Sequence, residues 1–204
     1  MGRHNLLSHI CYNIYMTKAE LRLYYKQKRL GIDPRQKLRM DDLLLIKFQQ
    51  MYFPQVSVLL TYWPHGKYNE PNTHLFSGYL RHTIPGLETS YPVIDDPTGH
   101  FNAVAVTEDT LFTTNKYGIN EPKDGIIIDP QEIDLVFVPL LAADMQGYRV
   151  GYGKGFYDKY LGYCRQDVLK VGFNYFAPVD KINDAQLFDI PLNYLVTTED
   201  IYEF

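Results

Sequence analysis

Hydrophobic and polar positions along the chain switch between helical and strand-like spacing, which predicts a series of helices and strands. Thr17 and Glu20 have the spacing of a capping box and predict a helix that runs to about Leu30. Asp33 followed by a proline predicts a second helix that runs to about Tyr52. Later segments are short and rich in β-branched and aromatic residues, as strands are. Strands are predicted at 56–62, 91–94, 103–107, 135–138, 169–173 and 194–197, helices at 73–81 and 156–164, and a tight loop at 117–122.

The order of these elements predicts the fold class. Leu135–Val138 is hydrophobic without alternation, as expected for a strand of a parallel sheet that is covered on both faces. Because strands and helices follow one another, we predict a three-layer α/β/α fold with a largely parallel open sheet. Segments 91–94 and 103–107 would form a small β-hairpin arm. Ligands of such sheets bind beyond the carboxyl ends of the strands, where loops 63–71 and 139–155 would lie.

Composition narrows the classes of protein. The chain has 204 residues, 46% of them hydrophobic, which is enough for one sizeable core. We predict a single domain at 17–204 and interpret 1–16 as an N-terminal extension from a mis-assigned start, with translation beginning at Met16. The net charge of −4 gives no general attraction to nucleic acid, and no apolar run is long enough to cross a membrane. Cys11 and Cys164 make no disulfide framework. We expect a cytoplasmic monomer that binds neither nucleic acid nor membrane.

The segment 144–158 carries the clearest chemistry. It contains four closely spaced glycines, which let successive backbone N–H groups turn toward one anion: Gly147, Gly151, Gly153 and Gly155. Arg149 and Lys154 add positive charge, and a helix predicted to begin near Phe156 would add the positive end of its dipole. Asp158 is a hard oxygen ligand that suits the Mg²⁺ of a polyphosphate. We interpret this segment as a phosphate-binding loop.

Two familiar phosphate motifs do not fit this loop. A P-loop requires Ser or Thr after its lysine, and Gly155 stands there. The dinucleotide motif requires a third glycine where Phe156 stands. A flexible glycine-rich hairpin without a ligand is the weaker alternative, because two cations and an aspartate are interleaved with the glycines.

Four cations share one face of the first predicted helix, at positions 18, 22, 26 and 29. Such a row is usually a solvated surface. Glu20 is the only acidic residue available to balance it, so a polyanionic partner is a second interpretation.

The chain resembles the 5-formyltetrahydrofolate cyclo-ligase family, also called methenyltetrahydrofolate synthetases. The most specific likeness is the segment from Val138-Pro139 to Tyr157-Asp158, in the order and spacing of the family. Lys18 with Leu21-Arg22 and the segment Asn69-Glu70-Pro-Asn-Thr73 are also similar, as are 115–122 and Asp189-Ile-Pro-Leu. The likeness covers essentially all of 17–204.

The resemblance implies an enzyme that converts 5-formyltetrahydrofolate and ATP to 5,10-methenyltetrahydrofolate, ADP and phosphate in the presence of Mg²⁺. It implies catalytic roles for Arg149, Lys154 and Tyr157. It implies an ATP site made of Lys18, Arg22, Arg149, Gly151, Gly153, Lys154, Gly155, Phe156 and Tyr157. The folate site would comprise Leu60, Glu70, Tyr117, Tyr152, Gly153, Lys154, Gly155 and Phe156. Asp158 and Asp189 would bind Mg²⁺.

Several positions depart from the family pattern. Phe156 replaces a common tyrosine, Asn193 a common aspartate, and Leu140 and Ala143 a frequent glycine and phenylalanine. These departures leave open a folate-binding protein without turnover. An isomerase or hydrolase of a sugar phosphate, which would use the loop for one phosphate, is also open. ATP consumption that depends on folate would distinguish the three.

Overall fold

Two helices begin the described part of the chain, in a computed structural model that describes residues 16–53, 55–95 and 99–204. The predicted capping box starts α1 (Lys18–Leu30): the Glu20 N–H donates to Thr17 Oγ1 and the Thr17 N–H donates to the Glu20 carboxylate. Asp33 caps α2 (Pro34–Phe48), which ends before the predicted Tyr52. The interpretation of residues 1–15 as an extension lies outside the described residues.

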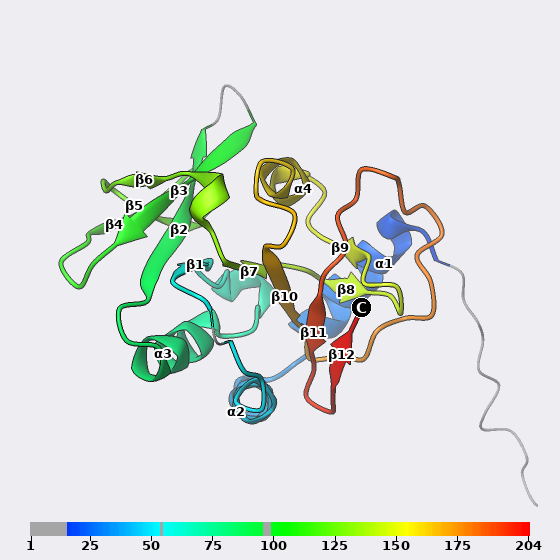
Figure 1. Cartoon of the computed structure of the whole chain (residues 1–204). Helices are drawn as coiled ribbons and strands as arrows, with labels where there is room; N and C mark the ends of the chain where they lie inside the picture. The colour runs from blue at the N-terminus through cyan, green and yellow to red at the C-terminus, as the bar shows by residue number, and fades with distance from the viewer. Residues whose placement is uncertain (1–15, 54, 96–98) are drawn as a thin grey trace, which may run out of the picture.

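The central feature is an eight-stranded sheet in the order β12-β11-β10-β7-β1-β2-β3-β6 (Figure 1). Its strands are β1 (Val58–Leu60), β2 (Glu88–Asp95), β3 (His100–Val106), β6 (Ile127–Ile128), β7 (Leu135–Val138), β10 (Leu169–Phe173), β11 (Tyr194–Val196) and β12 (Ile201–Glu203). The strands from β11 to β2 pair in parallel, and β12, β3 and β6 are antiparallel at the two edges. The prediction of an α/β fold with a largely parallel sheet is confirmed.

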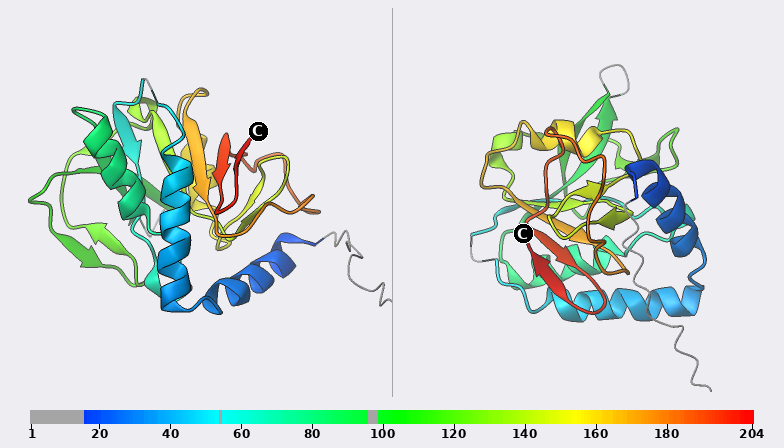
Figure 2. Two further views of the ribbon diagram at one scale, coloured as in Figure 1. Left: turned by 90° about the horizontal axis from the view of Figure 1, so that it is seen from below. Right: turned by 90° about the vertical axis from the view of Figure 1, so that its right-hand side faces the viewer.

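The central strand β7 shows how the layers are built. Leu135 and Phe137 pack into a core with α2 and α3 (Thr73–Thr83), whereas Val136 and Val138 pack into a second core with α4 (Phe156–Leu161). Successive side chains of a strand point to opposite faces, so a strand that is buried on both faces needs continuous hydrophobicity. Seen from below, α2 and α3 lie in front of the strands (Figure 2).

The predicted hairpin arm is present as β2 and β3, which are longer than expected and pair antiparallel. The prediction of an irregular loop at 117–122 is wrong for its second half, because β5 (Asn120–Pro122) pairs with β4 (Phe112–Thr114). The turn lies earlier: Asn115 Oδ1 accepts the N–H groups of Tyr117 and Ile119 at 2.9 and 3.0 Å.

Short strands of two or three residues escaped prediction, among them β12, β6, β8 (Ala142–Ala143) and β9 (Arg149–Val150). Two 3₁₀ turns, η1 (Gly66–Tyr68) and η2 (Pro130–Glu132), complete the elements. In the part of the chain that the structure describes, no helix combines the length and hydrophobicity that crossing a bilayer would require.

Candidate active site

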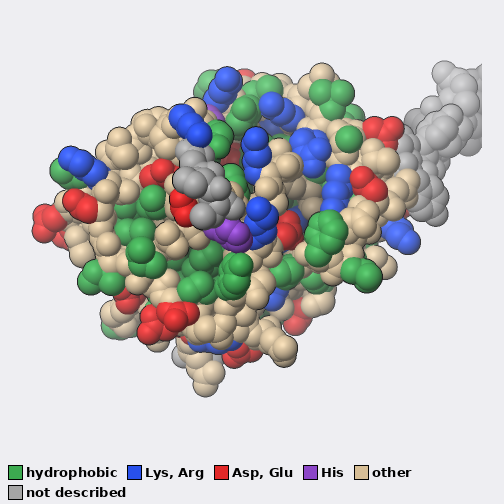
Figure 3. Space-filling view, turned by 90° about the horizontal axis from the view of Figure 1, so that it is seen from above, with side chains coloured by type: hydrophobic (Ala, Val, Ile, Leu, Met, Phe, Trp, Pro, Cys, Tyr) green, Lys and Arg blue, Asp and Glu red, His purple; other side chains and the backbone are tan. Residues whose placement is uncertain are grey.

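A cleft of about 650 Å³ lies beyond the carboxyl ends of β1 and β7. Both loops that were predicted to meet there contribute to it, together with α1, the arm and the segment before β11. The lining residues are Lys18, Arg22, Lys26, Tyr62, Trp63, His65, Tyr68, Glu70, Pro92, Ile94, Phe101, Tyr117, Ile119, Glu121, Pro139, Arg149, Gly151 to Lys159, Phe188 and Asp189. Six of them are Lys or Arg, and such side chains gather on the face of the molecule seen in Figure 3.

The glycine-rich loop is shaped by its backbone. Gly153 and Gly155 have φ of 90° and 69°, values that residues with a Cβ rarely adopt. Arg22 of α1 donates from Nε to Gly151 O at 2.9 Å, which fixes the loop against the helix. The helix that follows is shorter than the predicted 156–164, because α4 ends at Leu161 with Gly162 as its C-cap. The helix that would add its dipole to the loop is therefore only six residues long.

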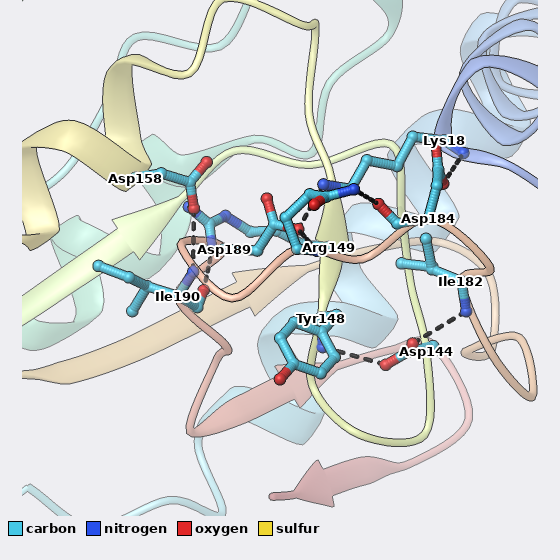
Figure 4. A network of polar contacts seen from close by, with 10 residues as sticks. Lys18, Asp144, Tyr148, Arg149, Asp158, Ile182, Asp184, Asp189 and Ile190 are labelled. Atoms are coloured by element: carbon cyan, nitrogen blue, oxygen red, sulfur yellow. Dashed lines mark hydrogen bonds and ion pairs between the residues drawn. The ribbon is translucent and has the colours of Figure 1, made fainter.

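The start of the loop is held by a buried carboxylate. Asp144 is completely buried and accepts three backbone N–H groups, from Gln146 at 2.9 Å, Tyr148 at 3.0 Å and Ile182 at 3.0 Å (Figure 4). These bonds close the turn between β8 and β9 and tie it to the segment near Ile182. Because three donors would lose their acceptor without it, Asp144 has a structural role beside the cleft.

Two ion pairs cross the cleft floor (Figure 4). Arg149 Nη2 lies 2.8 Å from Asp158 Oδ1, and this oxygen also accepts the Ile190 N–H at 3.1 Å. Lys18 Nζ pairs with Asp189 Oδ2, which also accepts the Gln186 N–H at 2.5 Å. Burial lowers the pKa of Arg149, and Asp158 and Asp189 oppose that shift. The guanidinium stays charged, since its ordinary pKa is far above neutral.

Asp158 and Asp189 each engage one carboxylate oxygen in this way. In the described residues, the other oxygen of each makes no hydrogen bond or ion pair. No group of three or more His, Cys, Asp or Glu side chains is arranged as a metal site among residues 16–53, 55–95 and 99–204. Protein groups alone therefore do not form a closed metal site in this part of the chain.

The opposite wall of the cleft is aromatic around one buried carboxylate. Glu70 is 5% exposed; its Oε2 accepts the His65 N–H at 2.6 Å, and its Oε1 accepts the Tyr152 hydroxyl. Burial raises the pKa of Glu70, and the His65 N–H, the Tyr152 hydroxyl and Arg29 oppose that rise. Burial also raises the pKa of Tyr152, so this hydroxyl is a hydrogen-bond donor at neutral pH.

Tyr157 is another residue that lines the cleft. Its hydroxyl oxygen is buried and has no hydrogen-bond partner among the described residues. Burial raises the pKa of Tyr157, and Glu70 raises it further, so the hydroxyl keeps its proton. A buried hydroxyl in a ligand cleft is expected to find a partner in the bound ligand or in water.

The comparison with known proteins agrees with this geometry. A sequence profile described as the 5-formyltetrahydrofolate cyclo-ligase family matches residues 17–194. The chain belongs to the 5-formyltetrahydrofolate cyclo-ligase family. This membership confirms the likeness that the sequence motifs indicated.

Individual cyclo-ligases are similar over different lengths. The match to 5-formyltetrahydrofolate cyclo-ligase of Mycoplasma genitalium is 39% identical over 66 residues, 32% of this chain and 40% of that protein. The match to the Mycoplasma pneumoniae cyclo-ligase is 25% identical over 187 residues, 90% of this chain and 100% of that protein. The solved Aquifex aeolicus 5,10-methenyltetrahydrofolate synthetase superimposes with a TM-score of 0.76 at 27% identity, covering 92% of this chain and 93% of that chain.

All but one of the residues that the cyclo-ligase resemblance selected line the cleft. The exception is Leu60, which is 0% exposed in the core with Val136 and Val138 and is not among the lining residues. The structure therefore does not bring Leu60 to the cleft surface.

The departures from the cyclo-ligase pattern fall into two groups. Phe156 lines the cleft, so the loss of a hydroxyl there changes its surface. Leu140 and Ala143 are buried in the core beneath it. The Asn193 side chain accepts the Lys170 N–H at 2.9 Å, and Asn193 is not among the lining residues. Its replacement of aspartate leaves the charge of the cleft wall unchanged.

Sequence reasoning missed several cleft residues of this chain. Trp63, His65 and Tyr68 follow the first strand within a segment predicted only as a loop, and Glu121 lies in a strand that was not predicted. Lys26 lies over the Tyr68 ring at 4.5 Å, a contact that unites α1 with that loop. The unbalanced cation row was the available signal for α1, and its positions 18, 22 and 26 line the cleft. Arg29 was wrongly placed on the same solvated face, because it is completely buried.

Proposed function

We propose that this protein catalyses the ATP- and Mg²⁺-dependent conversion of 5-formyltetrahydrofolate to 5,10-methenyltetrahydrofolate, with release of ADP and phosphate. The observation that carries the proposal is the single cleft in which a cation-rich loop faces a buried carboxylate surrounded by aromatic rings. A polyphosphate and a flat polar heterocycle require these two surfaces side by side. Membership of the cyclo-ligase family supports the same reaction.

The phosphate end of ATP is assigned to α1 and the glycine-rich loop. Lys18, Arg22 and Lys154 reach the cleft from these two elements and would offset the charge of the triphosphate. The backbone around Gly153 and Gly155 can approach an anion closely, because neither residue carries a Cβ. Gly151, Phe156 and Tyr157 complete this wall.

The donor set fits Mg²⁺ that arrives with ATP. Mg²⁺ commonly binds one or two carboxylates and completes its coordination with substrate phosphates and water. Asp158 and Asp189 line the cleft, and each keeps one carboxylate oxygen without a protein partner among the described residues. We assign these two residues to Mg²⁺, which would supply further charge compensation for the phosphates.

The folate end is assigned to the wall around Glu70. The Glu70 carboxylate accepts hydrogen bonds, as a reduced pteridine with its ring N–H and amino groups would require. Tyr117, Tyr152 and Phe156 line the cleft and would offer flat ring surfaces to the pteridine. Gly153, Lys154 and Gly155 line the same cleft and would contact both ligands.

The chain's own residues account for the catalytic steps by position and charge. The formyl oxygen is a poor leaving group, so it must first attack the γ-phosphorus of ATP and displace ADP. N10 then attacks the formyl carbon and loses its proton, and the C–O bond breaks as phosphate leaves. Arg149 and Lys154 would stabilise the charge that develops on the transferring group. The Tyr157 hydroxyl, protonated and without a hydrogen-bond partner among the described residues, would donate to the reacting oxygen. No covalent nucleophile on the protein is required.

The direct test combines purified protein with 5-formyltetrahydrofolate, ATP and MgCl₂ and follows the near-ultraviolet absorbance of the methenyl product. We expect a rise that requires all three components and is matched mole for mole by ADP. Folate binding without any rise would indicate a silent folate-binding protein. Neither a rise nor folate binding would indicate a different phosphate substrate, such as a sugar phosphate.

A further inference from the structure

Arg29 is a buried cation at the last turn of α1. Its side chain is 0% exposed, and it is not among the residues that line the cleft. It makes no direct ion pair with any carboxylate of the described residues. Burying a charge without a partner is costly, so the contacts of this guanidinium require an explanation.

The guanidinium of Arg29 reaches the cleft through a tyrosine. Its Nη1 donates to the Tyr152 hydroxyl oxygen at 3.2 Å, and its Nη2 donates to Leu140 O at 2.5 Å. The Tyr152 hydroxyl in turn donates to Glu70 Oε1. The positive charge and the buried carboxylate are therefore connected by one shared hydroxyl, and a cation at the far end makes that hydroxyl a stronger donor.

The backbone at the end of α1 and just beyond it holds the loop that carries the carboxylate. Asn69 Nδ2 donates to Arg29 O and to Ile32 O, each at 3.1 Å. Asn69 has a left-handed backbone with φ of 47° and directly precedes Glu70. The end of α1 thus fixes Glu70 through Asn69 and fixes its partner Tyr152 through the guanidinium. The glycine-rich loop and the loop that carries Glu70 are therefore both attached to the end of α1.

We propose that Arg29 is a positioning residue for folate recognition, which holds Tyr152 and Glu70 together in the orientation that the hydrogen-bond donors of the pteridine ring require. This inference rests on the proposed function. It explains why a fully buried cation ends a row whose other members are half-buried. It also assigns to α1 a role at the folate end in addition to its role at the phosphate end.

The protonation state of Glu70 gives a readout that a merely structural arginine would not change. The titratable groups that face Glu70 are Arg29, His65, Tyr62, Tyr152, Tyr157 and Tyr175. Burial raises the pKa of Glu70, and Arg29 is among the groups that hold it down. Without Arg29 the Glu70 carboxylate should have a higher pKa and should take up its proton earlier as the pH is lowered. The fall in folate affinity that accompanies acidification should therefore begin at a higher pH than in the wild-type protein.

The experiment measures folate and ATP affinity separately, by calorimetric titration between about pH 5 and pH 8, the range over which carboxyl groups with raised pKa values titrate. We compare Arg29→Met with Arg35→Met, a matched control at an exposed arginine of α2. For Arg29→Met we expect folate binding weakened about tenfold or more at neutral pH, an upward shift of the pH midpoint, and ATP binding changed by less than about threefold. In a Glu70→Gln background the midpoint shift should disappear.

A parallel loss of folate and ATP affinity without a midpoint shift would overturn the proposal. Tyr152→Phe removes only the shared hydroxyl, so it decides the question if Arg29→Met does not fold: an unshifted midpoint in that variant also overturns it. Failure of the proposed function is distinguishable, because the wild-type protein would then bind no folate or form no methenyl product.

Discussion

Lys154 lies on the glycine-rich loop with an exposed side chain, and among the described residues it makes no hydrogen bond or ion pair. Its replacement by alanine therefore removes a charge from the cleft and nothing from the fold. We expect the free energy of unfolding to change by less than about 0.5 kcal/mol, as for other exposed positions without partners.

The effect on turnover should be much larger. A unit charge about 4 Å from a phosphate oxygen contributes roughly 4 kcal/mol at an effective dielectric constant of about 20. Solvent screening and ordering of the long side chain reduce this value. Loss of one donor directed at the transferring group costs about 3 kcal/mol of barrier, which corresponds to roughly a hundredfold decrease in kcat.

The assay is methenyl product formation at saturating folate, ATP and Mg²⁺, with thermal unfolding measured on the same samples. Lys181→Ala is the matched control, because Lys181 is exposed and is not among the residues that line the cleft. Lys154→Arg should recover part of the rate. A decrease below about threefold in Lys154→Ala, or an equal decrease in the control, would refute the assignment of Lys154 to the transition state.

Three further predictions concern the scaffold. Asp144→Ala leaves three backbone N–H groups without their acceptor and should reduce the free energy of unfolding by about 3 kcal/mol or more in a urea titration; a change below about 1 kcal/mol would contradict this. Gly147→Ala should lower the melting temperature, because φ is 83° and an added Cβ would lie 2.9 Å from the Phe204 ring; an unchanged melting temperature would argue against strain there. Burial would raise the pKa of Asp134, but hydrogen bonds from Arg165 and two backbone N–H groups outweigh it and leave the pKa low. The contribution of ionised Asp134 to stability is present above its unfolded pKa and is lost as pH falls through its folded pKa. Asp134→Asn should therefore lower the free energy of unfolding at pH 7, and the difference between variant and wild type should shrink below about pH 4. A difference in stability that is independent of pH would refute the ionic origin.

The core of the fold was predictable because local patterns and global packing agree there. The capping box at Thr17 and the continuous hydrophobicity of β7 each specify one structure, and both are present. The edge strands were not predictable in the same way. Residues 120–122 contain a proline and a glutamate, and they form β5 only because the Asn115 turn brings them against β4. Such pairing depends on distant neighbours, which short sequence windows do not contain.

The residues of the candidate site show the same contrast between local and long-range signals. Glycine spacing and unpaired cations are local signals, and they selected Gly153, Lys154 and Arg22 correctly as cleft residues. Arg29 follows the same helical spacing as Arg22, yet it is buried. Spacing fixes which face of a helix a residue occupies, but the direction of a long side chain depends on what packs beside it. The partners of Arg29, at positions 140 and 152, are far away in the sequence, so no pattern within α1 could reveal its role.

The geometry of α1 links the two halves of the cleft. With a rise of about 1.5 Å per residue, Lys18 and Arg29 lie about 16 Å apart along the helix, enough to accompany a triphosphate and the ring of a second ligand placed end to end. Lys18 pairs with Asp189 at one end, Arg22 bonds the glycine-rich loop in the middle, and Arg29 supports the Glu70 wall at the other end. Under the proposed assignment of the two ligands, one rigid element would therefore set the distance between the phosphate groups and the folate ring. Because a transfer between two substrates depends steeply on the separation of the reacting atoms, a single helix that touches both subsites keeps that separation constant better than two independent loops would.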